Sequence, residues 1–287
     1  MSIDLVNHLS SGEGAPRLWI DFNAYTKKLL LGEGENPWTT PASYMSFYSQ
    51  AHGLVSAEVV VLDVWDLFHH WMLDDEDAIP SMAGKKRITV ALKKMLEAFA
   101  PRELLAEVLT AVSNNYAGAV PIVLVMPSPR SLLAKAHKAA NGDEVIPEES
   151  HVDTAAMYVA DFLRYYSETD ISGVLLMEDS ALMPESGEEI SWYQPVFNVA
   201  KHYRWSVGLH LPFTGESFDL PDDVNFSIVP AGSSAQESSM GVDISSSIWA
   251  GQGTDELPGN EKGFYYLTIP EDTKPEFVLE TISSLRE

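Results

Sequence analysis

The chain has 287 residues, 45% of them hydrophobic and 21% charged, a composition that excludes wholesale disorder and fibrous structure. Asp and Glu number 42 against 18 Lys and Arg, so the formal net charge is −24 with neutral histidines. Nucleic acids and anionic membranes bind basic surfaces, and this balance argues against both as partners. The absence of cysteine excludes disulfides, thiolate nucleophiles and Cys-ligated metal sites, so any metal would need His and carboxylate ligands.

Targeting segments are not evident in the sequence. No run of about 18 apolar residues occurs, and the opening MSIDLVNHLSSGEG lacks the basic head and apolar centre of a signal peptide. We therefore expect a cytoplasmic protein whose partner is a small-molecule substrate. Whether it forms a homodimer stays open.

Short β-rich runs alternate with helical periodicity along the chain, a pattern typical of a parallel sheet with helical crossovers. In chain order the predicted strands are Leu18 to Phe22, Val59 to Trp65, Ile122 to Met126, Gly173 to Met177, Trp205 to Leu211, Phe226 to Val229, Ser247 to Ala250 and Phe264 to Ile269. The predicted helices are Pro41 to Leu54, Ile88 to Tyr116 with a break at Pro101, Val152 to Tyr166, Ile190 to Arg204 and Pro275 to Leu285. Eight strands and a closing helix predict a single (β/α)8 barrel (TIM barrel) domain over residues 1–287, with an open doubly wound sheet as the alternative.

Both ends of the chain carry recognisable segments. Residues 263–276 read GFYYLTIPEDTKPE, residues 16–22 read PRLWIDF, and the second strand ends in Leu62-Asp63-Val64-Trp65-Asp66. In order and spacing these resemble the last strand, turn and closing helix, the first strand and the Asp-bearing second strand of the uroporphyrinogen decarboxylase superfamily. That superfamily also holds corrinoid methyltransferases and a methionine synthase branch, so the resemblance implies a barrel with decarboxylase or methyl-transfer chemistry.

The chain departs from the family at residues that carry its chemistry. The decarboxylases have arginines after the first strand, where this chain has Phe22-Asn23-Ala24-Tyr25, and a His near the end of the last strand, where it has Leu267-Thr268. Uroporphyrinogen itself is therefore not the expected substrate. The zinc-binding His-x-Cys of the methyltransferases corresponds to His210-Leu211-Pro212, which has no thiolate.

Reacting groups of a (β/α)8 barrel lie at the carboxyl ends of its strands, so strand-end residues are the candidates. Alternation along a strand places Asp21 and Asn23 on one side of the first strand and Asp63 with Trp65 on one side of the second. The same alternation turns His210 of the fifth strand inward. The structural alternative is that the aspartates accept backbone N–H bonds and that His210 is a satisfied core imidazole.

The fourth strand ends in two adjacent carboxylates, Glu178 and Asp179, of which one can face the pocket. We favour Glu178, which shares parity with Val174 and Leu176, because apolar neighbours raise the pKa of a carboxyl and suit it to proton donation. Asp63 is its predicted partner, as a base or as an anion that stabilises positive charge.

Further candidates would bind the substrate. Arg130 is the predicted ligand of a substrate carboxylate, with a surface position at a helix N-terminus as its alternative, and Ser128 lies beside it. Trp65, Trp249 and Tyr25 predict an aromatic pocket in which a flat substrate stacks.

Together these residues predict a cofactor-independent lyase, a decarboxylase of a small aromatic or conjugated carboxylated substrate. Glu178 or Asp63 would transfer the proton, His210 and Tyr25 would stabilise the developing charge, and Arg130 would hold a carboxylate. One alternative is a corrinoid or folate methyltransferase of the same superfamily, the only case in which a cofactor is expected, with zinc held by Glu178, His210 and a further carboxylate. Another is a non-catalytic binding or partner subunit. Nucleotide-binding, P-loop, HExxH and GxSxG motifs are absent from the sequence.

Overall fold

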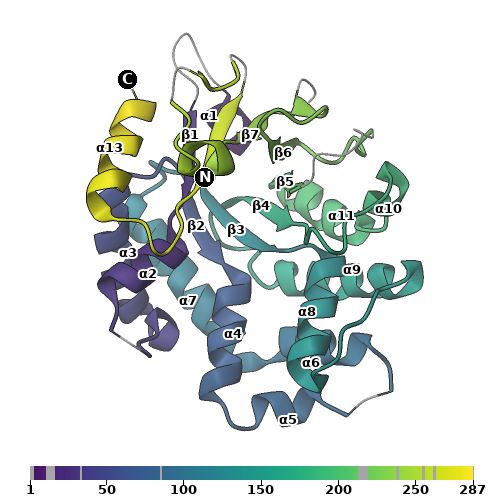
Figure 1. Cartoon of the computed structure of the whole chain (residues 1–287). Coiled ribbons are helices and arrows are strands. Elements are labelled where there is room, and N and C mark those ends of the chain that lie inside the picture. The colour runs from purple at the N-terminus through teal and green to yellow at the C-terminus, as the bar shows by residue number, and fades with distance from the viewer. Residues whose placement is uncertain are drawn as a thin grey trace.

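The computed structural model describes residues 3–10, 17–32, 34–84, 86–212, 219–236, 239–253, 256–260 and 263–286. Its centre is a nearly closed barrel of eight parallel strands (Figure 1). The strands are β1 (Arg17–Asp21), β2 (Val60–Asp63), β3 (Ile122–Pro127), β4 (Ile171–Met177), β5 (Ser206–His210), β6 (Phe226–Pro230), β7 (Gly241–Asp243) and β8 (Phe264–Thr268). They pair in the order β1-β8-β7-β6-β5-β4-β3-β2, which confirms the predicted (β/α)8 barrel and not the doubly wound sheet.

Helices surround this barrel (Figure 1). They are α1 (Leu5–Leu9), α2 (Asn23–Leu30), the 3-10 helix η1 (Pro37–Thr39), α3 (Pro41–Val55), α4 (Val64–Asp74), α5 (Ala78–Met82), α6 (Thr89–Glu97), α7 (Phe99–Tyr116), α8 (Pro129–Asn141), α9 (Glu149–Arg164), α10 (Gly187–Ser191), α11 (Gln194–Tyr203), α12 (Ser245–Trp249) and α13 (Pro275–Leu285). None of the described helices has the length and apolarity needed to cross a lipid bilayer.

The predicted seventh strand, Ser247 to Ala250, is wrong. The seventh strand is β7, and most of the predicted residues belong to α12. The Asp243 carboxylate at the end of β7 accepts a hydrogen bond from the Ser245 N–H at 2.9 Å, which turns the chain into the helix. Serine side chains form such local hydrogen bonds readily and fit strands poorly, so the chain turns here and does not continue as an extended strand.

Two other boundaries differ from the prediction for identifiable reasons. The second strand ends at Asp63 instead of Trp65, because the Asp63 side chain accepts the Asp66 N–H at 3.0 Å and caps α4. The predicted helix break falls at Ala98, whose backbone is extended, and Pro101 lies in the first turn of α7. Proline is tolerated there because an N–H in the first turn has no intrahelical acceptor.

The barrel interior is apolar and rich in aromatic rings. Trp19 of β1 lies 5.8 Å from Phe264 of β8 and 6.2 Å from Phe226 of β6, measured between ring centroids. A small residue on the neighbouring strand makes room for them, since a Cβ at Gly208 of β5 would lie 2.2 Å from the Phe226 ring. Two leucines of α1, Leu5 and Leu9, are fully buried against the same interior side chains. Helix α1 therefore closes the amino end of the barrel and leaves the carboxyl end for the site.

The barrel does not close by strand pairing at β1 and β2, which the sheet order leaves apart. Tyr48 of α3 is fully buried beside this seam, and its hydroxyl accepts a hydrogen bond from the Val61 N–H of β2 at 3.2 Å. Its ring lies 5.8 Å from that of Phe22, which follows β1. A tyrosine thus satisfies a main-chain donor that a neighbouring strand would otherwise take.

Candidate functional site

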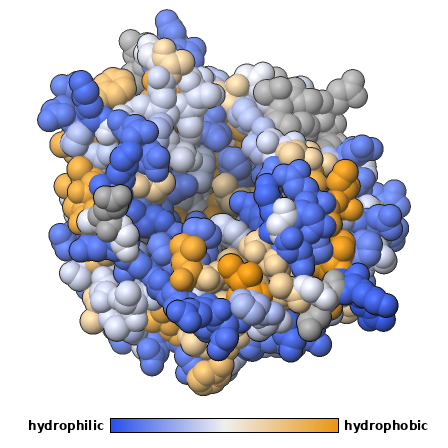
Figure 2. Space-filling view, turned by 60° about the horizontal axis from the view of Figure 1, so that its bottom comes forward, coloured by the Kyte–Doolittle hydropathy of each residue, from blue (hydrophilic) through white to orange (hydrophobic). Residues whose placement is uncertain are grey.

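Ionisable side chains gather at the carboxyl ends of the strands. Asp21 ends β1, Asp63 ends β2, His210 ends β5 and Asp243 ends β7. Tyr266 of β8 adds a phenol, with its ring 5.3 Å from the His210 ring. Figure 2, which brings the lower end of Figure 1 and the side of α4 forward, shows that this face is hollowed near its middle. We call these five residues the mouth cluster.

A histidine and an aspartate form the best-defined contact of the mouth cluster. His210 Nε2 lies 3.1 Å from Asp243 Oδ2. Burial opposes the charged form of Asp243, yet hydrogen bonds from His210 and Ser245 hold its pKa below the usual range. An ionised carboxylate can only accept, so Nε2 carries a proton, and in the neutral form of the ring Nδ1 has the lone pair. Nδ1 is buried and has no hydrogen-bond partner among the described residues.

Asp21 lies beside this pair. Its carboxylate accepts hydrogen bonds from the Tyr266 hydroxyl at 3.4 Å and from the Asn23 N–H at 3.3 Å. Burial raises the pKa of Asp21, and these hydrogen bonds and the charge of a protonated His210 act against that rise. Asp21 thus accepts a backbone N–H, as the structural alternative predicted, and it also lies in the mouth cluster.

Asp63 combines a structural position with an unusual acidity. Its carboxylate caps α4, as described above, and burial raises its pKa to about 7, with the neighbouring charge of Asp66 adding to the rise. The charges of Asp21 and Lys27 also act on it, in opposite directions. A carboxyl with a pKa near 7 exchanges protons readily at neutral pH.

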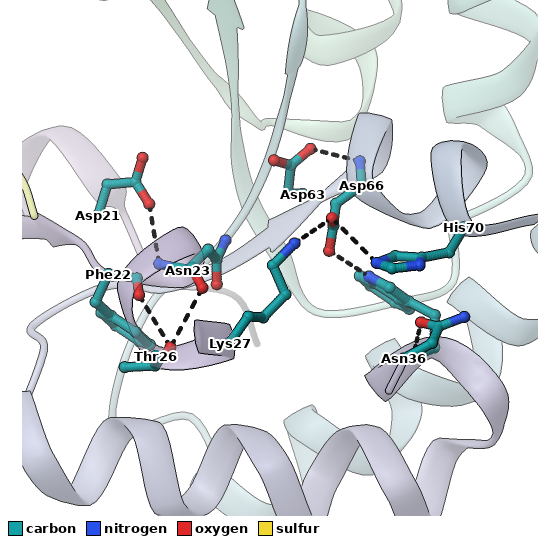
Figure 3. A network of polar contacts seen from close by, with 10 residues as sticks. Asp21, Phe22, Asn23, Thr26, Lys27, Asn36, Asp63, Asp66 and His70 are labelled. Carbon is teal, nitrogen blue, oxygen red and sulfur yellow. Dashed lines mark hydrogen bonds and ion pairs between the residues drawn. The ribbon is translucent and has the colours of Figure 1, made fainter. Parts of the chain in front are cut away.

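Lys27 is held next to these carboxyls by Asp66 (Figure 3). The Asp66 carboxylate accepts a hydrogen bond from the Trp38 indole N–H at 2.8 Å and forms an ion pair with Lys27. His70 Nε2 lies 3.6 Å from the same carboxylate, and burial lowers the pKa of this ring. Figure 3 shows the Lys27 chain reaching from α2 toward Asp66, with Asp63 beside the start of α4. The contacts join α2, η1 and α4, so they fix a cation at the rim of the mouth cluster.

Glu178 lies in a different layer of the molecule. Leu175 and Met177 of β4 pack with the barrel interior, whereas Val174 and Leu176 pack outward against the helices. Glu178 shares the outward parity, so the expectation that it faces the pocket is not met.

The Glu178 carboxylate is buried beneath α8 and α11. It accepts hydrogen bonds from the hydroxyls of Ser128 and Tyr193, both at 2.7 Å, and from Ser131 at 3.4 Å. Burial raises the pKa of Glu178 to about 7 although these donors favour its charged form. Ser128, predicted to bind substrate, caps α8 and is fully buried in this network. The proton-transfer role of Glu178 stays a prediction.

Arg130 is already occupied by protein groups. Its guanidinium pairs with Glu189 of α10 and lies 5.1 Å from the centroid of the Trp192 ring. It is 7% exposed. Binding of a substrate carboxylate there would have to displace Glu189.

The three predicted aromatic residues do not converge. Tyr25 of α2 is buried in the outer core, where burial and the charge of Glu276 raise its pKa. Trp65 lies on the first turn of α4 and lines a groove beside α8. Trp249 of α12 donates its indole N–H to the Thr268 carbonyl at 2.7 Å.

The described residues therefore separate the predicted site into two groups. Asp21, Asn23, Asp63 and His210 lie together at the mouth, whereas Glu178, Ser128 and Arg130 lie around α8. The predicted zinc site needs Glu178 and His210 in one place, and within the described ranges no three His, Asp or Glu side chains are placed to hold a metal ion.

Sequence reasoning missed Asp243 and Tyr266. Asp243 ends a strand of three residues, which is too short for an alternating pattern to identify it. Tyr266 shares parity with Phe264 in a correctly predicted strand, and this spacing could have found it. No model of a known protein family matches the sequence, and no curated protein matches it.

Proposed function

We propose that the chain is an acid–base enzyme of the cofactor-independent lyase type, a decarboxylase of a small aromatic or conjugated carboxylic acid. The observation that carries the proposal is the mouth cluster, in which a carboxyl with a pKa near 7, Asp63, accompanies a His210–Asp243 pair whose buried Nδ1 has no partner among the described residues. Two proton-transfer groups at the carboxyl ends of barrel strands are the minimum that this chemistry needs.

Asp63 is the proposed proton donor. In the reaction the bond between the substrate carbon and its carboxylate breaks, the electron pair stays on the conjugated carbon, and carbon dioxide leaves. The protonated Asp63 carboxyl gives its proton to that carbon, and the resulting carboxylate recovers a proton from water. One proton is consumed per turnover, and no oxidant or reductant is needed.

His210 is the proposed orienting base. Asp243 keeps the proton on Nε2, so in the neutral ring Nδ1 is the atom that would accept a hydrogen bond from a substrate hydroxyl or N–H group. Nδ1 is buried, so the side chains that cover it have to move when the substrate binds. The bond would orient the substrate, and Tyr266 offers a ring beside it.

Raised carboxyl pKa values also make the mouth compatible with an anionic substrate. Asp21 and Asp63 both hold protons more strongly than exposed aspartates, because burial raises the pKa of each. The mouth therefore carries less negative charge at neutral pH than its carboxyl count implies. Lys27 adds a cation at the rim. Asp66 pairs with it, as Glu189 pairs with Arg130, but the Lys27 side chain is 27% exposed against 9% for Arg130, so it is the proposed attraction for a substrate carboxylate in place of Arg130.

The resemblance to the uroporphyrinogen decarboxylase superfamily supports this proposal through Asp63, which ends the second strand in both patterns. The methyltransferase alternative is weaker, because the ligands proposed for its zinc lie in different layers. The binding-subunit alternative has no observation in its favour beyond the departures from the family motifs.

The test is a panel of aromatic and conjugated carboxylic acids incubated with the purified protein in D2O, with carbon dioxide release and deuterium at the vacated carbon as readouts. We expect turnover that falls by about 100-fold or more in Asp63→Asn and in His210→Gln. A substrate decarboxylated equally well by both variants contradicts the proposal. A protein partner that co-purifies, together with a wholly unreactive panel, supports the binding-subunit alternative.

A further inference from the structure

A groove separate from the mouth cluster lies between α4, α8 and the segment after β4. Its volume is about 610 Å³, within the range of small-molecule sites. It is lined by Trp65, Ser131, Ala134, Lys135, Lys138, Ala139, Glu144, Val145, Ile146, Asp179, Ala181 and Leu182. None of these residues belongs to the mouth cluster, so anything bound in the groove would occupy a second site.

Among the described residues, one lysine of the groove has no carboxylate partner. Lys135 Nζ lies 5.5 Å from the centroid of the Trp65 ring and forms no ion pair within the described ranges. Its neighbour Lys138 is different, because it pairs with Glu144 at 2.8 Å, and the charge of Asp179 also helps to raise its pKa. Both carboxylates of the groove thus interact with Lys138. Lys135 is a half-buried cation in a chain of net charge −24.

The wall facing this lysine is apolar and open. Ile146 is 82% exposed, and Val145, Leu182 and Ala181 continue the surface. An isoleucine so exposed gains from any apolar surface that covers it. Trp65 lines the same groove as Val145 and Ile146, so a flat ring bound there has an indole as well as aliphatic side chains to pack against.

We propose that this groove binds a small aromatic carboxylate, with the ring against Trp65 and Ile146 and the carboxylate on Lys135. Charge complementarity selects an anion, and the aromatic and aliphatic lining selects a flat apolar body. The site goes beyond the decarboxylase proposal, since it would bind its ligand whether or not the mouth cluster is catalytic.

The test uses 2-naphthoate as the probe and 2-naphthamide as its uncharged counterpart, both titrated into the full-length protein by calorimetry. We expect saturable binding of naphthoate with one site per chain, weakened about tenfold in Lys135→Gln and in Trp65→Leu. Naphthamide should bind about tenfold more weakly than naphthoate to the parent protein and should not respond to Lys135→Gln. Lys93→Gln is the matched control, because Lys93 also lies over a ring, that of Tyr158, but is paired with Glu97 on the surface.

Location is tested with Asp63→Asn and His210→Gln, which alter the mouth and leave the groove intact. Unchanged naphthoate binding in both supports the groove, whereas loss in both places the probe at the mouth and overturns the proposal. Equal affinity for naphthoate and naphthamide, full affinity in Lys135→Gln, or no saturable binding at millimolar probe also overturns it. Thermal melting of each variant confirms that Lys135→Gln and Trp65→Leu are folded before binding is compared.

Discussion

His210 Nε2 lies 3.1 Å from Asp243 Oδ2, although the two residues end strands that are not neighbours in the sheet. β6 lies between β5 and β7, so the side chains meet at the carboxyl end of the barrel and not along a strand pair. The contact fixes both the ring orientation and the tautomer of His210. It also explains why a carboxylate as buried as Asp243 keeps a pKa below its usual range.

The first prediction concerns this tautomer. Asp243→Asn keeps the shape of the side chain but offers an amide, which can donate to Nε2 and shift the proton to Nδ1. We expect turnover of a substrate found by the panel to fall by about 100-fold or more, with little change in melting temperature. The 15N shifts of the His210 ring report the tautomer directly, and Ser245→Ala, which retains the His210–Asp243 pair, is the control. Unchanged ring shifts in Asp243→Asn would show that Asp243 does not set the tautomer.

The second prediction concerns the pH dependence of catalysis. Asp63 donates only while protonated, so with a pKa of about 7 the rate should fall as the pH rises above 7. Asp63→Asn should remove most of the activity and that limb of the profile, while asparagine still caps α4. Carbon-detected NMR titration of labelled aspartate side chains measures the pKa without a substrate. An Asp63 carboxyl that titrates near pH 4 is inconsistent with the proposed donor.

The third prediction separates Glu178 from Asp63 through stability. The folded state raises the pKa of Glu178 to about 7 from an ordinary value of 4.5, so it binds a proton that the unfolded chain releases between these two values. Stability should therefore fall as the pH rises from about 4.5 to about 7 and then level off, by on the order of 3 kcal/mol for this group.

Glu178→Gln has no charge to bury and should make that slope shallower in urea unfolding measured across the same pH range, while Asp63, whose pKa is also raised to about 7, keeps its own contribution to the slope. Asp179→Asn is the control, because the adjacent Asp179 is only half-buried and its carboxylate accepts the Ala181 N–H of a turn. An unaltered slope in Glu178→Gln would mean that this carboxyl titrates normally in the folded protein.

Much of the fold follows from the hydrophobic runs, because barrel strands are short, apolar and separated by helices. Predictions from the hydrophobic runs were wrong where an element is very short or where a helix follows a strand with no loop between them. β7 has three residues, and α4 begins directly after β2, so its first residues read as a continuation of the strand. The helix α8 was not predicted. Capping side chains decide where α4 and α8 begin, and those of Asp63 and Ser128 were predicted only as site residues.

The candidate site was less accessible to sequence reasoning than the fold. Alternation correctly turned His210 inward, because Gly208 and His210 alternate with the apolar residues Val207 and Leu209, which form the other side of the strand. In β4 every position up to Leu176 is buried, so alternation could not tell which face is the interior, and Glu178 was assigned to the wrong side. The pairing of His210 with Asp243 depends on tertiary geometry across β6, which no local pattern contains.

The fourth prediction concerns the seam between β1 and β2. Tyr48→Phe removes the acceptor of the Val61 N–H and leaves a buried donor unsatisfied, which should cost about 1–3 kcal/mol. Tyr44→Phe is the matched control, since Tyr44 is buried on the same helix and stacks on Tyr48 but is not bonded to β2 in the described structure. The free energies of unfolding from urea titrations compare the two. Equal losses would show that the hydroxyl of Tyr48 does not satisfy the seam.

The fifth prediction concerns the packing of the barrel interior at Gly208. A Cβ there would lie 2.2 Å from the Phe226 ring, which is itself held by Trp19 and Phe264 and has little room to move. Gly208→Ala should therefore destabilise the fold by about 1–3 kcal/mol through overpacking. Gly53→Ala is the opposite case, because a Cβ at this exposed position of α3 meets nothing within 4 Å, and it should stabilise the protein by about 0.5–1 kcal/mol. Opposite signs in the two free energies of unfolding are expected, and a neutral Gly208→Ala would mean that the ring of Phe226 can be displaced at little cost.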